Sequence, residues 1–273
     1  MGELGLGYLS VFGLPPLEFI GLAADLGCPN ISMFLRGLPL APLGYPPFSL
    51  KKDAALRGAV RAAAQQHGVT ITLGDGFLVT PDADVRLFAA DLDVIVELGI
   101  PRINVVSLDP DRGRTFDQFG ALAELAAQRG LRTVLEPVPG LTVGDLATAL
   151  AAVRHVGRPD FQLLIDTMHM ARSGSSPADL VAVDSQYIGY AQLNDTTLQP
   201  RLANYMEEAM FERLPPGEGE LPLREFIQAL PTNVVIELEV PQRSLALSGH
   251  SPIDRLRPCV DAARRLLSDD VIG

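Results

Sequence analysis

The sequence has little cysteine and no excess of basic residues. Its two cysteines, Cys28 and Cys259, lack the CxxC spacing of a zinc or redox site and the density of a disulfide scaffold. We therefore expect both to be reduced residues that pack in the interior. The formal net charge of −11 argues against a nucleic-acid partner and against attraction to an anionic membrane surface.

The chain also lacks a long hydrophobic run and the features of a targeting segment. No apolar stretch approaches the roughly 18 residues of a membrane span. The first residues, MGELGLGYLSVFG, contain neither a basic region nor a small-residue cleavage site, and Leu6 breaks the myristoylation pattern. These absences favour a soluble, cytoplasmic protein that does not bind a membrane.

Several motifs of common enzyme classes are missing as well. The segment LSVFGLPP follows the first predicted strand without the glycine-rich turn GxGxxG that a dinucleotide-binding open sheet places there. No GxSxG, Walker A or HExxH sequence occurs. These absences argue against several familiar classes of enzyme.

What the sequence does contain is a repeat of an amphipathic segment, a glycine and a short β-rich run. The glycines at these junctions are Gly27, Gly68, Gly99, Gly130 and Gly157. Glycine directly after a helix adopts the left-handed cap conformation easily, and a strand that follows at once is typical of βα repeats. Alternating strands and helices predict a parallel sheet.

We predict eight strands, near residues 5–10, 29–34, 69–74, 101–107, 131–136, 161–166, 187–193 and 233–240. We predict eight helices, near residues 15–26, 52–66, 82–98, 116–129, 143–156, 177–184, 221–229 and 252–267. Hydrophobic residues make up 47% of the 273 residues, enough for a large core. A closed (β/α)₈ TIM barrel, which typically needs about 250 residues, is the predicted α/β fold, and a doubly wound open sheet is the alternative. We expect one domain over residues 1–273, since no linker divides the chain.

Local signals mark several helix ends. In Thr80-Pro81, Ser176-Pro177 and Ser251-Pro252, a capping hydroxyl precedes a proline at the expected first helical position. The segment from Thr115 to Gln118 resembles a capping box. Pro258 is expected to end or kink the last helix.

The segment FQLLIDTMHM, residues 161–170, organises the predicted site. We expect a buried strand that ends at Asp166, with His169 three residues later. Three other predicted strands carry comparable polar groups at their ends, namely Glu136, Gln192 and Glu239. Because the carboxyl ends of neighbouring parallel strands meet at one end of a barrel, these side chains are expected to meet at one centre.

Three carboxylates and one amide oxygen are a suitable ligand set for a divalent metal. Clustered carboxylates repel one another unless a cation is present, and all-oxygen ligands suit Mn²⁺ or Mg²⁺ better than structural zinc. We therefore expect one divalent ion, with Co²⁺ or Zn²⁺ as alternatives, held by Glu136, Asp166, Gln192 and Glu239. Glu237 lies two residues before Glu239 and faces the same way in a strand, so it remains an alternative ligand.

Other polar residues lie near the same strand ends. His169 is expected to contact the substrate or to support a metal ligand, and a buried histidine bonded to the backbone is the alternative. Arg213 is expected either to carry a positive charge to the substrate or to pair with a neighbouring glutamate. Asn104 and Asp195 are expected to bind a polyol or to orient a metal ligand.

Two long loops, residues 35–50 and 194–220, are candidate walls or lids of the site, and variable surface decoration is the alternative. The second contains YMEEAMFE, which predicts a short helix. Residues 75–79 and 108–114 are expected to contribute to specificity as well. The first loop is rich in leucine and proline and poor in charge, which favours a substrate less polar than a sugar phosphate.

The ordered set of motifs resembles the xylose-isomerase-like TIM-barrel superfamily over nearly the whole chain. The resemblance rests on VLEP at Glu136, DxxH at Asp166 and His169, QLxD at Gln192, the turn PGEGELPL and LEVP at Glu239. It implies that the strand-end groups bind one divalent metal. Members include sugar isomerases and epimerases, inosose and 3-dehydroshikimate dehydratases, and endonuclease-IV-like enzymes.

Two features separate these members. Many epimerases have histidine where this chain has Gln192, and glutamine there is similar to some 3-dehydroshikimate dehydratases. Endonuclease-IV-like enzymes use a histidine-rich trinuclear zinc site, and four histidines with a net charge of −11 argue against that group.

The resemblance implies a metal-dependent sugar isomerase or epimerase that acts on a small keto-polyol through an enediolate. Glu136 and Glu239 would be the acid/base pair, with His169 also catalytic. The alternative is a lyase, a dehydratase of the 3-dehydroshikimate or inosose type, in which His169 would carry the proton to a departing hydroxyl. A non-catalytic ligand-binding barrel is a further alternative. Because members often form dimers or tetramers, a homodimer or homotetramer is also expected.

Overall fold

The computed structural model describes residues 4–269, in which eight parallel strands close into a barrel. The strands are β1 (Leu4–Leu6), β2 (Asn30–Phe34), β3 (Thr70–Val79), β4 (Arg102–Ser107), β5 (Arg132–Leu135), β6 (Phe161–Asp166), β7 (Ile188–Leu193) and β8 (Ile236–Leu238). Each strand pairs with the next, and β8 pairs with β1. The predicted (β/α)₈ barrel is thus confirmed, and the open-sheet alternative is wrong.

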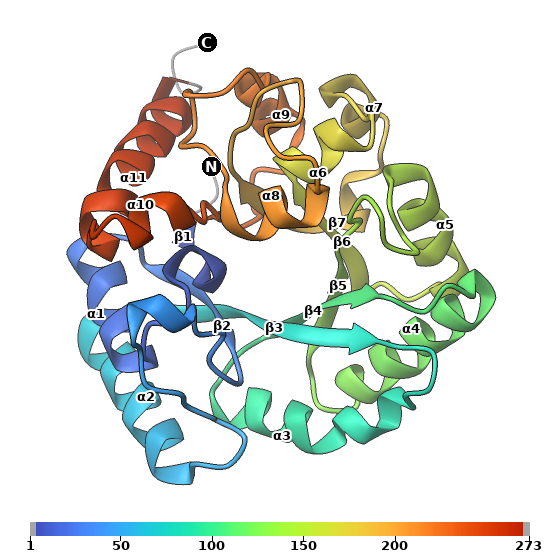
Figure 1. The fold of residues 1–273 in the computed structure, drawn as a ribbon. Helices are drawn as coiled ribbons and strands as arrows, with labels where there is room; N and C mark the ends of the chain where they lie inside the picture. The colour runs from blue at the N-terminus through green and yellow to red at the C-terminus, as the bar shows by residue number, and fades with distance from the viewer. Residues whose placement is uncertain (1–3, 270–273) are drawn as a thin grey trace.

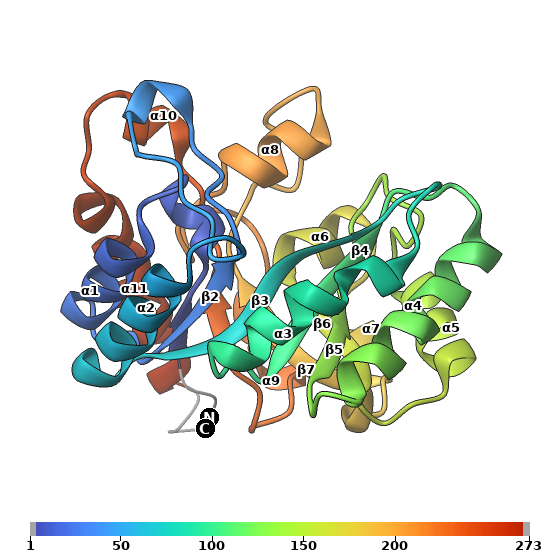
Figure 2. The same ribbon diagram turned by 90° about the horizontal axis from the view of Figure 1, so that it is seen from below.

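Helices surround the barrel (Figure 1). Those that follow the predicted pattern are α1 (Pro16–Asp25), α2 (Ala54–His67), α3 (Ala89–Glu97), α4 (Arg112–Ala127), α5 (Leu146–Val156), α7 (Pro177–Val181), α9 (Leu223–Ala229) and α11 (Pro252–Asp269). Three further α-helices lie in the loops after strands, namely α6 (Thr167–Arg172), α8 (Tyr205–Phe211) and α10 (Arg243–Leu247). Figure 2 shows α8 and α10 at the same end of the barrel, above the carboxyl ends of the strands.

The interior of the barrel has an apolar layer beneath the polar one. Leu73, Val134, Leu164 and Tyr190 form a small cluster of fully buried side chains. Each lies two residues before a polar residue of its chain segment, namely Asp75, Glu136, Asp166 and Gln192. Side chains two apart on a strand face the same side, so the same alternation builds both the packed layer and the polar layer above it.

The helix-ending glycines behave as the pattern predicts. Gly27, Gly68, Gly99, Gly130 and Gly157 all have a positive φ, between 64° and 74°. The chain therefore reverses into each following strand through a left-handed residue, which glycine adopts without steric cost. Both cysteines are buried and unpaired, as predicted.

The helix starts were predicted in part. Ser176 forms a capping box with Asp179, and the Ser251 hydroxyl accepts a hydrogen bond from the amide of Asp254. The Thr80 and Thr115 caps are wrong: the side chain of Asp84 caps the short 3₁₀ helix η3 (Val85–Phe88), and that of Asp111 caps α4.

Other predicted boundaries also shift. Pro258 does not end the last helix, because α11 continues through it. β1 is shorter than predicted, and residues 8–11 form a 3₁₀ helix, η1 (Tyr8–Val11). A Cβ atom at Gly7 would lie only 2.9 Å from Oε1 of Glu237, so glycine permits the close approach at this turn. In the part of the chain that the structure describes, no helix has the length and apolarity needed to cross a membrane.

Candidate metal-binding active site

A cavity of about 630 Å³ lies at the carboxyl end of the barrel. Its polar lining includes Asp75, Asn104, Glu136, His169, Arg213 and Glu239. Its apolar lining includes Phe34, Leu35, Leu38, Phe77, Leu108, Met206 and Met210. All four segments predicted to contribute to specificity therefore reach the cavity, and the charged side chains of Arg36 and Lys51 line it as well.

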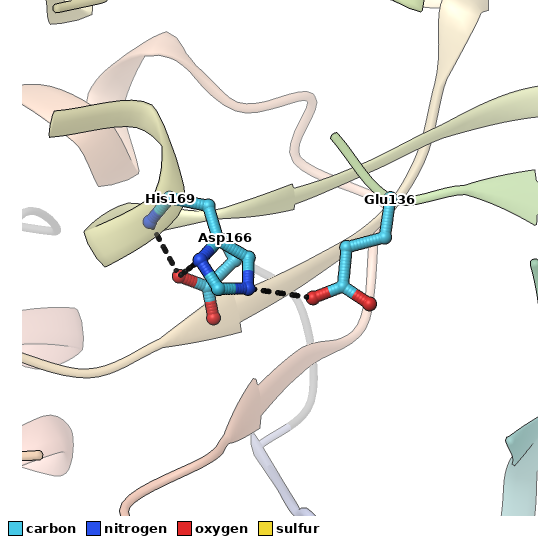
Figure 3. Close-up of side chains that lie close together, drawn as sticks. All are labelled: Glu136, Asp166 and His169. Atoms are coloured by element: carbon cyan, nitrogen blue, oxygen red, sulfur yellow. Dashed lines mark hydrogen bonds and ion pairs between the residues drawn. The ribbon is translucent and has the colours of Figure 1, made fainter. Parts of the chain in front are cut away.

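The carboxylate of Glu136, directly after β5, has a different partner at each oxygen. Its Oε2 accepts a hydrogen bond from Nδ2 of Asn104 at 2.7 Å. Its Oε1 lies 3.2 Å from Nε2 of His169 (Figure 3). Asn104 thus orients a predicted metal ligand, one of the two roles expected for it.

Asp166 ends β6 and is also the N-cap of α6. Its Oδ1 accepts a hydrogen bond from the backbone amide of His169 at 2.9 Å, the usual contact of an N-cap with the third residue of the helix. Its Oδ2 accepts hydrogen bonds from Nδ2 of Asn194 at 2.7 Å and from Arg213 at 2.6 Å. Burial alone would raise the pKa of this carboxyl, but the charges of Arg213 and His169 hold it below its usual value.

Three of these side chains are close enough to share an ion. One ligand atom each from Glu136, Asp166 and His169 lies within 4.8 Å of the others. Glu239 lies outside this group in the described chain, because Arg213 stands between Asp166 and Glu239. The guanidinium reaches Oδ2 of Asp166 at 2.6 Å and Oε2 of Glu239 at 3.0 Å.

Gln192 links the two glutamates of the β8 segment. Its Nε2 donates to Oε1 of Glu237 at 3.3 Å and to Oε1 of Glu239 at 3.1 Å. Glu239 lines the cavity, whereas Glu237 is fully buried and accepts a hydrogen bond from the Tyr190 hydroxyl at 2.9 Å. The geometry therefore favours Glu239 over Glu237 as a ligand that faces a substrate.

Arg213 is 3% exposed and lies on the cavity surface. Its Nε donates to the carbonyl of Ala209 at 2.7 Å, which fixes the guanidinium plane. Burial opposes its charge, but Asp166 and Glu239 outweigh that effect and raise the pKa of Arg213. It pairs with these two carboxylates rather than with the glutamates near it in sequence.

Asp195 is the predicted site residue that the structure places elsewhere. Its Oδ2 accepts hydrogen bonds from the amides of Gly217 and Gly219 at 2.9 and 3.0 Å, and its Oδ1 from that of Leu221 at 3.2 Å. A Cβ at Gly219 would lie 2.2 Å from Asp195, so the glycine is needed for this contact. We therefore correct its assignment: Asp195 holds the turn PGEGE instead of binding substrate.

Two residues near the predicted site were not assigned individual roles from the sequence. Asp75 is buried in β3, which runs five residues beyond its predicted end. Tyr205, in α8, hydrogen-bonds Nδ1 of His169 through its hydroxyl. No local pattern marks Tyr205, whereas Asp75 could have been found from its position two residues after Leu73 in a strand.

The residues present fit a divalent cation. Oε1 of Gln192 is buried and has no hydrogen-bond partner among the described residues. A buried amide oxygen left without a partner costs about 1–3 kcal/mol, so a ligand for it is expected. Gln192 pairs with Asp166 in the barrel and bonds Glu239, and Glu136 lies in one group with Asp166. Oxygen donors of this kind suit Mg²⁺ or Mn²⁺.

The fold and this set of strand-end groups define a class of (β/α)₈ barrels with an acidic centre. The chain belongs to the xylose isomerase-like TIM barrel family, whose model matches residues 20–265. The resemblance seen in the motifs is thus confirmed. No curated protein sequence matches the chain.

Solved structures with the same fold have low sequence identity to this chain. The IOLI protein with a bound zinc atom has a TM-score of 0.80 at 17% identity, over 98% of each chain. The probable 3-DHS dehydratase AsbF from Bacillus anthracis has a TM-score of 0.74 at 16% identity, over 96% of this chain and 98% of that one. A D-psicose 3-epimerase solved with D-fructose has a TM-score of 0.71 at 16% identity, over 99% and 98%.

One further match is a longer protein. The chain spans 44% of a fusion of a xylose isomerase-like TIM barrel with 4-hydroxyphenylpyruvate dioxygenase, at 20% identity and a TM-score of 0.75.

Proposed function

We propose that the protein is a divalent-metal-dependent isomerase or epimerase of a small polyhydroxylated keto compound. One observation carries the proposal: Glu136 and Glu239 line the same cavity, the first against His169 and the second against Arg213. Moving a proton between carbons, or between the two faces of one carbon, needs groups that can remove and return it. The likeness to a D-psicose 3-epimerase supports this choice.

Glu136, Asp166, Gln192 and Glu239 would hold the metal, with Mn²⁺ or Mg²⁺ as the proposed ion. When bound, the ion acts as a Lewis acid toward a carbonyl oxygen and lowers the cost of removing the adjacent proton. The zinc in the IOLI protein supports a divalent ion in this fold without deciding which one.

The protein side chains supply proton transfer, orientation and exclusion of water. Glu136 and Glu239 would exchange the proton with carbon. Arg213, fixed by Ala209 and Asp166, would hold a substrate oxygen near Glu239. The leucine, methionine and phenylalanine walls would keep water away from the reacting carbon.

A dehydratase is the second candidate, and the position of His169 favours it. This side chain is 4% exposed, lies beside Glu136 and faces the cavity, so it could deliver a proton to a departing hydroxyl. The apolar walls and Gln192 point the same way, as does the likeness to a probable 3-DHS dehydratase. Both candidates begin with removal of a proton next to a carbonyl.

The first experiment is elemental analysis of the purified protein beside Asp166→Ala. We expect bound Mn, Mg, Co or Zn in the wild type and its loss in the variant. The matched control is Asp184→Ala, which removes an exposed aspartate before β7, at the opposite end of the barrel. Absence of metal from the wild type even after Mn²⁺ is added would refute the metal site.

The reaction is then tested in D₂O with keto sugars, inososes and 3-dehydroshikimate. We expect deuterium to enter at the carbon next to the carbonyl, detected by NMR. An epimer or isomer as product supports the first candidate, and a conjugated product that absorbs in the near ultraviolet supports the second. A metal-loaded protein that exchanges no proton in any of these compounds would instead favour a ligand-binding barrel.

A cytoplasmic location is part of the proposal. Cys28 and Cys259 are both free and buried, which agrees with a reducing compartment. Fractionation of the producing cells would test it.

A further inference from the structure

The two short helices above the site face each other through matched pairs of residues. His169 and Arg172 lie three residues apart on α6, and Tyr205 and Glu208 lie three apart on α8. Residues at this spacing share one face of a helix. Tyr205 hydrogen-bonds Nδ1 of His169, and Arg172 contacts Oε1 of Glu208 at 3.1 Å.

Glu208 anchors α8 at this place. Its side chain is fully buried, and its Oε1 also accepts a hydrogen bond from the Thr196 hydroxyl at 2.8 Å. Its Oε2 accepts one from the amide of Arg201 at 3.2 Å. A buried charge is tolerated only when it is paired and hydrogen-bonded, so α8 is held where these partners are.

The hydrogen-bond inventory of His169 decides which of its nitrogens carries the proton. An ionised carboxylate only accepts hydrogen bonds, so Nε2, which faces Oε1 of Glu136, must carry a hydrogen. The proposal concerns the neutral form of the imidazole, in which the other nitrogen, Nδ1, is then an acceptor. The partner of Nδ1 is the hydroxyl of Tyr205, which must therefore donate.

We propose that Tyr205 is a positioning residue, which fixes His169 in the tautomer and orientation that present the Nε2 hydrogen to Glu136 and the cavity. The Arg172–Glu208 pair holds α8 so that the Tyr205 hydroxyl reaches Nδ1. The role in turnover rests on the proposed function, whereas the hydrogen bond itself is a property of the protein without substrate. Helix α8 lies well after His169 in the sequence, yet through Tyr205 it fixes the tautomer and orientation of this imidazole beside Glu136, a proposed metal ligand.

The test is ¹⁵N NMR of histidine-labelled full-length protein loaded with diamagnetic Mg²⁺. The chain has four histidines, and a His169→Gln spectrum assigns the resonance. In the wild type at pH above the imidazole titration we expect a protonated Nε2 and an Nδ1 shifted by hydrogen bonding. In Tyr205→Phe we expect the Nδ1 resonance to move toward that of a nitrogen without a donor.

The matched control is Tyr187→Phe, which removes a hydroxyl in η4 (Ser185–Tyr187), at the opposite end of the barrel. It should leave the His169 resonances unchanged. Glu208→Gln, which keeps the shape of the side chain, should move Nδ1 in the same direction as Tyr205→Phe. An Nδ1 resonance that is the same in Tyr205→Phe and in the wild type would overturn the proposal.

Turnover gives the second measurement. With a substrate found in the D₂O experiment, Tyr205→Phe should lower kcat by about 10–100-fold, the usual effect of losing a residue that orients a site residue, with little change in KM. An unchanged kcat together with a shifted Nδ1 would overturn the catalytic part of the role. Failure to find any substrate would count against the proposed function and leave the NMR outcome standing.

Discussion

Asp166 and Glu237 are both fully buried carboxylates in the barrel interior, yet their environments shift their pKa values in opposite directions. At Asp166, Arg213 at 2.6 Å and the nearby His169 outweigh burial and lower the pKa. At Glu237, burial and the charge of Asp75 raise the pKa to about 8.

The comparison teaches that burial raises the pKa of an interior carboxyl unless nearby positive charges and hydrogen bonds outweigh it, as they do at Asp166. Glu237 has a hydroxyl and an amide as partners, from Tyr190 and Gln192. The pKa of Glu239 is also raised well above its usual value, because burial and the neighbouring carboxylates outweigh the opposing charge of Arg213. A divalent ion beside Glu239 would add the further positive charge that its ionised form requires.

The largest expected effect separates the two glutamates of the β8 segment. Glu239→Gln should lower turnover by about 10²–10⁴-fold, the usual contribution of a general acid or base. Glu237→Gln should keep most of the turnover. The raised pKa keeps the Glu237 carboxyl protonated near neutral pH, so the native side chain is already uncharged, like the amide that replaces it. Steady-state kinetics on both variants measures this, and equal losses would show that the two positions do not differ in function.

Removal of Arg213 should make the Asp166 environment resemble that of Glu237. In Arg213→Met, two buried carboxylates lose their cation, and we expect a loss of about 3–5 kcal/mol in the free energy of unfolding. Urea unfolding of the metal-free protein measures it. Arg213→Lys, which keeps the charge, is the control and should lose less; a fully stable Arg213→Met would contradict this account of the site.

The pH dependence of stability tests the Glu237 environment. Its folded pKa of about 8 lies above the usual glutamate value of 4.5, so between these values the folded state keeps a proton that the unfolded state has lost. Stability therefore falls as pH rises through this window. Glu237→Gln should remove that part of the slope in urea unfolding of the metal-free protein. Parallel slopes for the variant and the wild type would show that Glu237 does not titrate there.

The smallest effect is expected at Asp195, a buried carboxylate whose two oxygens accept hydrogen bonds from backbone amides. Asp195→Asn should lower the free energy of unfolding by about 1–3 kcal/mol, because some amides of the turn lose their acceptor. Metal content should stay at the wild-type level in elemental analysis. Loss of the metal in this variant would show that Asp195 contributes to the metal site after all.

Much of the fold could be predicted because its signals are local. Left-handed glycines after helices and caps such as Ser176 depend on neighbours a few residues away. Errors arose where another residue forms the cap, as at Asp111, or where segments far apart in the sequence lie close together, as at Gly7 beside Glu237. Strand length in β3 depends on its neighbours in the barrel, and so it was underestimated.

The sequence by itself determined the barrel and the strand ends that carry Glu136, Asp166, Gln192 and Glu239, because strand alternation places side chains on a defined face. Only the tertiary structure decided that Arg213 joins Asp166 to Glu239, that Asp195 holds a turn and that Tyr205 reaches His169. These contacts join residues far apart in the chain, and their geometry depends on how long loops fold over the barrel. No local pattern encodes such a distance.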